Sequence, residues 1–224
     1  MKYLLSKDDV LKLSYISQKI VDKQLVVGPG GNISIRTDNI MWISPSGFAL
    51  DQIQEDQWVP VQIHNGQSLH PSLRPSSEIA MHLEIYRNRK DINAIVHTHP
   101  PITIGIISTE HNEIPAMFPD FVALVGKVPF IEYVVPCSTE LANSVINVLQ
   151  DPAYNALYLK NHGLITLGTN IMQAYYRTEI IENAAKVFWV SKTVGTPRAL
   201  LEHEIQEILN LEAEKYRQKL LERG

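Results

Sequence analysis

The chain has 224 residues, of which 45% are hydrophobic, so it can bury a substantial core. Its formal net charge is −4 and its basic residues are dispersed, which argues against a nucleic-acid-binding protein. No apolar run approaches the ~20 residues that cross a bilayer, so we expect no membrane partner.

Cys137 is the only cysteine, which excludes a disulfide within the chain and fits a reducing compartment. It also excludes a cysteine-based zinc site, so any metal must be bound by His, Asp or Glu. The N-terminal segment, residues 1–9, has too short an apolar stretch for a secretory signal. We therefore expect a cytoplasmic protein.

Helical and strand patterns alternate along the chain. In the first half we expect a helix from Ser6 or Asp8 to about Gln24, strands at 33–36, 41–44 and 59–63, a helix at 77–89, a strand at 94–98 and a helical segment at 102–108. In the second half we expect a strand at 127–135, a helix at 138–149, paired strands at 156–160 and 163–167, and helices at 171–194 and 198–223.

This order predicts a single α/β domain that spans residues 1–224. The sequence contains no internal repeat, low-complexity linker or shift in composition that would mark a domain boundary. Several strands follow one another without a helix between them, so the sheet should not be purely parallel.

A pair of histidines, His97 and His99, follows the apolar run 94–96 and precedes two prolines. Side chains alternate along a strand, so these two imidazoles point the same way and could bind one metal ion. A third candidate, His162, lies between two apolar runs. Three histidines would leave a position open for water or substrate, as catalytic zinc sites do. Spacing alone does not show that His162 comes near the pair, and packed histidines remain an equal alternative.

Three loops have the chemistry to hold a phosphate: residues 28–32, 44–47 and 76–77. They offer glycine N–H groups, hydroxyls and the free N–H groups of a helix start, all of which bind anions. None matches a Walker or dinucleotide fingerprint. Each loop alone is more commonly a plain turn or a helix cap.

Glu78 directly follows the third loop and falls in the first turn of the expected helix. A carboxylate there is stabilised by the helix dipole, which would be a purely structural role. The functional alternative is a metal ligand or a general base beside the metal.

Together these segments resemble the class II aldolase/adducin family. The matching segments, in chain order, are Gly30-Gly31-Asn32-Ile33-Ser34, Ser44-Pro45-Ser46-Gly47, Pro75-Ser76-Ser77-Glu78, Val96-His97-Thr98-His99 and Asn161-His162-Gly163. Each motif is unremarkable alone, but their order and spacing from the first helix to the penultimate one are highly specific.

The resemblance implies a three-layer αβα fold with a central, mainly antiparallel sheet, and a homotetramer with active sites at subunit interfaces. It implies that His97, His99 and His162 bind Zn²⁺, with Mn²⁺ or Co²⁺ as alternatives. Glu78 would be the catalytic acid/base and an additional ligand when substrate is absent. The substrate phosphate would be held by Gly31, Asn32, Ser46, Gly47, Ser76 and Ser77.

The activity implied is reversible aldol cleavage of a ketose 1-phosphate to dihydroxyacetone phosphate and an aldehyde through an enediolate. Glu78 favours the aldolases over the epimerases of the family, which resemble Ser-Ser-Asp at this point. The alternatives are a decarboxylase of a phosphorylated 3-oxo sugar acid, an epimerase or a dehydratase. An adducin-like scaffold would lack the metal histidines, which are all present here.

One segment departs from the fuculose-phosphate aldolases of the family, which carry a Tyr after the Ile-Pro-Ala at 114–116. Here the segment continues as Phe118-Pro119-Asp120-Phe121. Asp120 could contact the second half of the substrate, or it could simply cap a loop. Tyr216 is a candidate for the C-terminal Tyr that closes the site in this family, or an ordinary packing residue.

Overall fold

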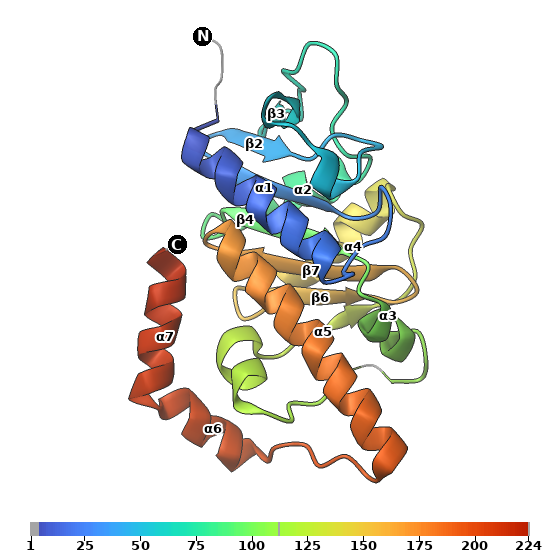
Figure 1. Cartoon of the computed structure of the whole chain (residues 1–224), viewed down its shortest axis with the longest axis vertical. Helices are drawn as coiled ribbons and strands as arrows, with labels where there is room; N and C mark the ends of the chain where they lie inside the picture. Colours follow the sequence, from blue (N-terminus) through green and yellow to red (C-terminus); the bar gives the residue numbers. More distant parts are fainter. Residues whose placement is uncertain (1–4, 112, 224) are drawn as a thin grey trace.

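The computed structural model describes residues 5–111 and 113–223, so residues 1–4 of the N-terminal segment lie outside it. Its centre is a seven-stranded sheet (Figure 1). The strands are β1 (Asn32–Thr37), β2 (Ile40–Ile43), β3 (Val59–Gln62), β4 (Ala94–Thr98), β5 (Phe130–Ile131), β6 (Ala156–Leu159) and β7 (Gly163–Gly168). They are ordered β3-β2-β1-β4-β7-β6-β5, and only the β5–β6 pair is parallel. The prediction of a mainly antiparallel sheet is confirmed.

Helices cover both faces of this sheet. They are α1 (Lys7–Asp22), α2 (Ile79–Asn88), α3 (Pro101–Ile107), α4 (Thr139–Leu149), α5 (Ile171–Val194), α6 (Glu202–Asn210) and α7 (Glu212–Arg223), with short 3-10 helices η1 (Leu50–Gln52) and η2 (Glu55–Gln57) and a π-helical turn η3 (Phe121–Val125). In Figure 1, α1 and α5 cross the near face, and α2 and α4 lie behind. The three-layer αβα arrangement is therefore confirmed. No helix in the described part of the chain is long and apolar enough to cross a membrane.

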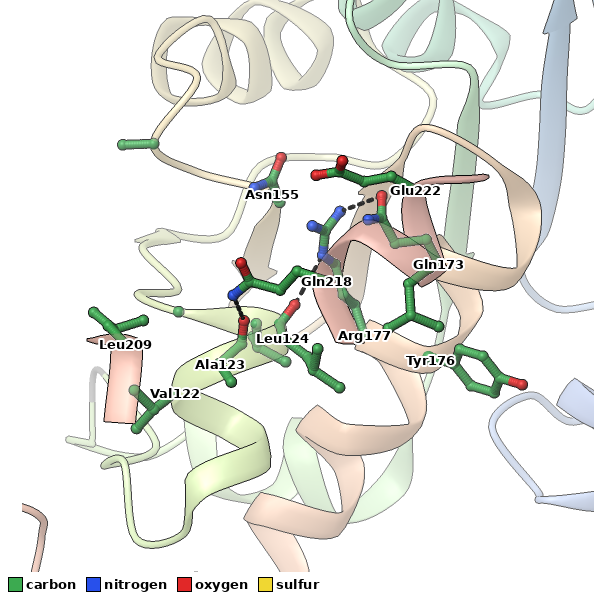
Figure 2. Close-up of a pocket in the computed structure, with 14 residues that line it drawn as sticks. Val122, Ala123, Leu124, Asn155, Gln173, Tyr176, Arg177, Leu209, Gln218 and Glu222 are labelled. Atoms are coloured by element: carbon green, nitrogen blue, oxygen red, sulfur yellow. Dashed lines mark hydrogen bonds between the residues drawn. The ribbon is translucent and has the colours of Figure 1, made fainter. Parts of the chain in front are cut away.

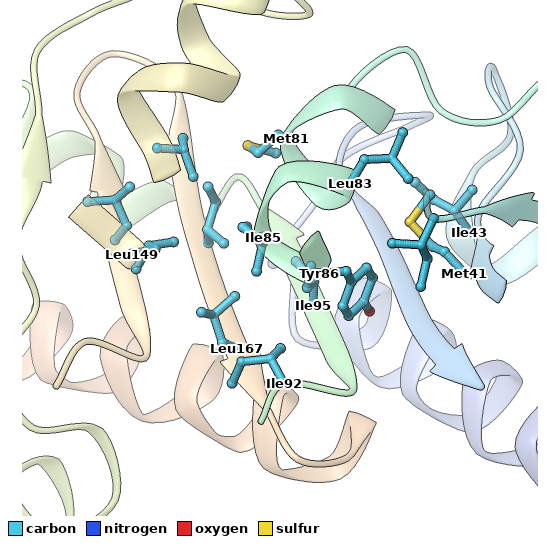
Figure 3. Close-up of a cluster of buried hydrophobic side chains, with 14 of the residues drawn as sticks. Met41, Ile43, Met81, Leu83, Ile85, Tyr86, Ile92, Ile95, Leu149 and Leu167 are labelled. Atoms are coloured by element: carbon cyan, nitrogen blue, oxygen red, sulfur yellow. The ribbon is translucent and has the colours of Figure 1, made fainter. Parts of the chain in front are cut away.

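Strand alternation divides the core between the two faces of the sheet. Ile95 of β4 is buried in a cluster with side chains of α2 and α4, which Figure 3 shows around Met81 and Ile85. Val96, the next residue, belongs instead to the cluster beneath α1 and α5. His97 lies two residues after Ile95 on the same strand, so its side chain points to the same face of the sheet, toward the layer that contains α2.

Two predicted elements differ from the structure. The strand expected at 127–135 is reduced to β5, which pairs with β6 only at Phe130 and Ile131. β5 lies at the edge of the sheet, and Pro129, directly before it, lacks the N–H that would extend the ladder in that direction. The last predicted helix is divided at Leu211, whose backbone is extended (φ −62°, ψ 126°).

The helix starts are also more sharply defined than the sequence indicated. Ser6 caps α1, because its side chain accepts a hydrogen bond from the N–H of Asp9. α2 begins at Ile79, so Glu78 is the cap residue and does not lie in the first turn as predicted. Its carboxylate makes no capping hydrogen bond and is free to point elsewhere.

Candidate metal centre and active site

The three histidines come from two strands and one turn that adjoin in the middle of the sheet. His97 on β4 pairs with Asn32 of β1 on one side and with Ile165 of β7 on the other. His99 follows the end of β4, and His162 lies in the turn between β6 and β7. Glu78 approaches from the start of α2. Each of the four offers one ligand atom, and these atoms all lie within 4.8 Å of one another.

The contacts in this cluster bring the carboxylate oxygens of Glu78 close to the Nε2 atoms of the histidines. Oε2 of Glu78 lies 3.0 Å from Nε2 of His97, and Oε1 lies 3.3 Å from Nε2 of His162. Nε2 of His99 lies 3.1 Å from Nε2 of His97. The imidazole of His97 is oriented by a backbone contact, since its Nδ1 lies 3.1 Å from the carbonyl oxygen of Leu164. A proton on Nδ1 leaves Nε2 as the atom directed into the cluster.

Two glycines allow the neighbouring loops to pack against the histidine strand. A Cβ on Gly163 would overlap the carbonyl oxygen of Thr98 and lie 2.9 Å from Cδ2 of His99. A Cβ on Gly31 would lie 2.8 Å from the carbonyl oxygen of His97, and its φ is +69°. Only glycine meets both the space and the backbone requirement there. Gly31 therefore has a structural role beside the phosphate role predicted for it.

Electrostatics favour a positive charge at this point. Burial acts to raise the pKa of Glu78, but the neighbouring imidazoles of His97 and His162 outweigh burial and hold that pKa below its ordinary value. Burial lowers the pKa of His99 to about 4, helped by the charges of His97 and His162. At neutral pH the cluster therefore combines a carboxylate with at least one uncharged imidazole.

This donor set fits a divalent cation. Oε1 of Glu78 and Nδ1 of His162 are buried and have no hydrogen-bond partner among the described residues. A cation would satisfy the buried carboxylate, whose charge is costly to bury unpaired. Three imidazole nitrogens and one carboxylate oxygen are ligands that zinc and neighbouring transition metals accept, so they do not identify the metal.

The three loops predicted to hold phosphate meet beside Glu78. The N–H of Ser76 donates to the carbonyl of Ser44 (3.0 Å), and the Ser44 hydroxyl accepts from the N–H of Ile33 (3.3 Å). The Ser76 hydroxyl accepts from the N–H of Glu78 (3.3 Å). These contacts join the second loop to the third and to β1. Of the residues named for this role, Ser46, Gly47 and Ser77 are exposed, Gly31 is half-buried, and Asn32 and Ser76 are buried.

Three residues near the site were missed by the sequence prediction: Ser34, His82 and Tyr86. They form a buried chain of hydrogen bonds that ends on Asn32 and Glu78. The available signal was polar spacing: the cap residue Glu78 is followed by His82 and Tyr86 at intervals of four residues, which places all three on one side of the helix.

The two remaining candidates lie outside the histidine cluster. Oδ1 of Asp120 accepts hydrogen bonds from both terminal nitrogens of Arg217, each at 2.9 Å. Tyr216 is 66% exposed. The structure of the described residues does not connect either side chain with Glu78 or the histidines.

A separate cavity of about 290 Å³ lies between η3, α5 and α7 (Figure 2). Arg177 donates to the carbonyl of Leu124 (3.1 Å) and Gln218 donates to the carbonyl of Ala123. Burial lowers the pKa of Arg177 to about 10, so the guanidinium stays charged at neutral pH. None of the site residues predicted from the sequence lines this cavity.

Comparison with known proteins agrees with the geometry. Residues 12–189 match the family described as Class II Aldolase and Adducin N-terminal domain. An L-fuculose phosphate aldolase of Methanococcus maripaludis is 34% identical over 183 residues, which cover 81% of this chain and 97% of that protein. A 5-deoxy-D-ribulose 1-phosphate aldolase of Bacillus thuringiensis serovar kurstaki is 35% identical over 208 residues, covering 92% and 95%.

A 3-oxo-tetronate 4-phosphate decarboxylase of Haemophilus influenzae is a more distant relative, 26% identical over 200 residues that cover 87% of this chain and 93% of that protein. The structure of an L-fuculose 1-phosphate aldolase superimposes with a TM-score of 0.84 at 29% identity, covering 97% of this chain and 100% of that one. The resemblance seen in the sequence motifs is confirmed. The chain belongs to the class II aldolase and adducin family.

Proposed function

We propose that this protein is a metal-dependent aldolase that reversibly cleaves a ketose 1-phosphate to dihydroxyacetone phosphate and an aldehyde. One observation carries the proposal: His97, His99, His162 and Glu78 converge on one point beside three loops that can hold an anion. Two of the relatives described above are named as aldolases of sugar phosphates, which supports this substrate class.

In this proposal His97, His99 and His162 hold the cation, and Zn²⁺ is the ion we expect. A divalent ion there would supply Lewis-acid stabilisation of the negative charge that develops on the substrate's carbonyl and hydroxyl oxygens. Glu78 carries the proton. In cleavage the hydroxyl on the fourth carbon gives its proton, through water, to the Glu78 carboxylate. The bond between the third and fourth carbons breaks, its electron pair stays on the enediolate, and Glu78 passes the proton on to the third carbon. In synthesis the Glu78 carboxylate removes that proton.

The loops position the substrate through its phosphate. We assign this task to Gly31, Asn32, Ser46, Gly47, Ser76 and Ser77. Their support is the contact of the second loop with the third and with β1, immediately beside Glu78. A homotetramer with active sites at subunit interfaces and a cytoplasmic location are further parts of the proposal, the latter supported by an exposed free thiol at Cys137.

The role of Glu78 is tested by Glu78→Gln, which keeps the shape of the side chain but cannot transfer the proton. We expect metal to stay bound and turnover to fall by about 10²–10⁴-fold. Glu212→Gln is the matched control, since Glu212 is 89% exposed on α7. Full activity of Glu78→Gln would refute the assigned role. The substrates to screen are the 1-phosphates of fuculose, ribulose, rhamnulose, 5-deoxyribulose and methylthioribulose.

A decarboxylase of a phosphorylated 3-oxo sugar acid is the second candidate, and the Haemophilus influenzae relative favours it. The metal centre and phosphate loops would serve both reactions. Dihydroxyacetone phosphate released from a ketose 1-phosphate supports the aldolase, whereas carbon dioxide released from a 3-oxo acid 4-phosphate supports the decarboxylase. A metal assay on the purified protein separates both from an adducin-like scaffold.

A further inference from the structure

Polar side chains of α2 and β1 face each other in matched steps. On α2 they are His82 and Tyr86, preceded by the cap residue Glu78, and on β1 they are Asn32 and Ser34. Four residues of helix rise about 6 Å, and two residues of strand rise about 6.6 Å. Because these steps nearly agree, each helix residue can reach a strand residue beside it. The result is a ladder of side chains between the helix and the sheet.

The ladder is a continuous chain of hydrogen bonds. Tyr86 Oη lies 2.9 Å from Ser34 Oγ and donates to the Ser34 carbonyl oxygen (3.1 Å), and Ser34 Oγ lies 2.7 Å from Nδ1 of His82. Nε2 of His82 lies 2.6 Å from Oδ1 of Asn32, and Nδ2 of Asn32 donates to Oε2 of Glu78 (2.9 Å). Ser34, His82 and Tyr86 are 0% exposed and Asn32 is 3% exposed. Buried polar groups of this kind are costly unless every one is satisfied.

The acceptor at Asn32 fixes the direction of the chain. An amide oxygen can only accept, so Nε2 of His82 must donate to it, and Nδ1 must accept from the Ser34 hydroxyl. His82 is therefore the neutral tautomer that carries its proton on Nε2. Burial, helped by the charge of His97, lowers the pKa of His82 to about 3, which agrees with a neutral ring.

The Glu78 carboxylate can only accept, so it selects the NH₂ end of the Asn32 amide, and the Nε2–H of His82 holds the amide in that orientation from its other end. If the amide were rotated by half a turn, its oxygen would face the Glu78 carboxylate and its NH₂ would face the Nε2–H of His82. Both contacts would then be repulsive. In the observed orientation the NH₂ group has two hydrogens, and Glu78 is its only partner among the described residues.

We propose that His82 is a positioning residue that holds Asn32 as a double donor, with one N–H on the Glu78 carboxylate and the other reserved for the substrate phosphate. This inference rests on the proposed function, because that function places the phosphate at Asn32 and the proton transfer at Glu78. Ser34 and Tyr86 would then also be positioning residues, since they hold the ring of His82.

The first test uses the metal-loaded enzyme with inorganic phosphate as the probe. In His82→Leu the amide is free to rotate, and we expect the inhibition constant of phosphate and the KM of the sugar phosphate each to rise about tenfold or more. In His82→Gln an amide nitrogen replaces Nε2 as the donor to Asn32, and both constants should stay within about threefold of wild type. Metal content, measured on the same samples, should be unchanged in both variants.

The second test is a double-mutant cycle with Asn32→Ala, in which the mediating amide is gone. There His82→Leu should cause no further loss of phosphate binding. If His82→Leu does not fold, Ser34→Ala replaces it in the cycle. Its loss of phosphate binding should be smaller, and it should likewise disappear in the Asn32→Ala background. Three results would overturn this inference while leaving the proposed function standing. They are equal losses in both backgrounds, loss of metal from His82→Leu, and phosphate binding like that of wild type in His82→Leu. Phosphate that does not compete with substrate in wild type, or an Asn32→Ala enzyme that binds it normally, would overturn the proposed phosphate site as well.

Discussion

The middle of the sheet and the C-terminal helices differ in how deeply their residues are buried. His97 is 0% exposed, lies between two strands and has a backbone partner for its second nitrogen. α6 has no buried residue. In Figure 1 the chain turns back after α5, and η3 lies between α5 and the helices α6 and α7. The end of α7 reaches the start of α5, where the amide of its cap residue Asn170 donates to the carbonyl of Leu221 (2.7 Å).

The difference shows which part of this chain is held by close backbone approaches and which part is held by side-chain contacts alone. Close backbone approaches hold the histidine cluster, so a single added carbon disturbs it. The contacts of α7 are an exposed ion pair between Asp120 and Arg217 and part-buried hydrogen bonds such as that of Asn170 with Leu221. The family match also ends at residue 189, before α6 begins. Proposals that rest on Tyr216 therefore need separate experiments from those that rest on the histidines.

The largest effect should follow from Gly163→Ala, which attacks the centre directly. The new Cβ would overlap the Thr98 carbonyl and crowd the rings of His99 and His97. We expect the free energy of unfolding, measured by denaturant titration, to fall by at least about 3 kcal/mol. Metal analysis should show that the variant has also lost metal binding. Gly47→Ala is the control: its Cβ meets nothing within 4 Å, and its positive φ of +83° should cost only about 1 kcal/mol. Equal losses would show that the close approach at Gly163 does not matter.

Removal of metal should have the next largest effect. A cation present at a hundred times its dissociation constant stabilises the folded state by about 2.7 kcal/mol, so a chelator should lower the melting temperature clearly. His99→Ala should lose the metal and with it the response to the chelator. Arg217→Ala, on α7, should keep both. A His99→Ala protein that is metal-replete and active would contradict the assignment of His99 as a ligand.

A smaller effect should appear in the pH dependence of stability. The pKa of His82 is about 3 in the folded protein, well below its ordinary value of 6.5. Below pH 6.5 the unfolded chain therefore binds a proton at this position and the folded protein does not, so stability falls as the pH is lowered from 6.5 towards 3. The contribution is at most about 1.4 kcal/mol per pH unit. In chelated protein, His82→Gln should lose stability less steeply than wild type between pH 4 and 6.5. Identical slopes would contradict a buried, neutral His82.

Part of the candidate metal site could be predicted from the sequence. The alternation rule placed His97 and His99 on one face of a strand, and it was enough to suggest a pair of ligands. It could not place His162, because that depends on β7 lying beside β4 in the sheet. Resemblance supplied that step, and the topology now shows the proximity of His162 to the pair.

Other features depended on packing that local patterns do not encode. The matched steps of α2 and β1 arise only when the two elements lie side by side, so His82 looked like an ordinary helix residue. β5 was overestimated because β-branched residues continue beyond Ile131, although Tyr133 is 56% and Val135 is 63% exposed. The break at Leu211 has no proline or glycine to announce it.

The smallest effects on stability should come from the ion pair between Asp120 and Arg217. Their side chains are 54% and 37% exposed, so solvent screens the pair and its loss should change the unfolding free energy by less than about 1 kcal/mol. Arg217 also pairs with Glu214 (2.6 Å), so Arg217→Ala should cost slightly more than Asp120→Asn in denaturant titrations. Kinetics with the aldehyde varied can then separate two roles. A higher KM for the aldehyde in Asp120→Asn alone would mean that the carboxylate contacts the second half of the substrate. The same small change in both variants would mean that Asp120 only anchors α7, and that aldehyde specificity is determined elsewhere.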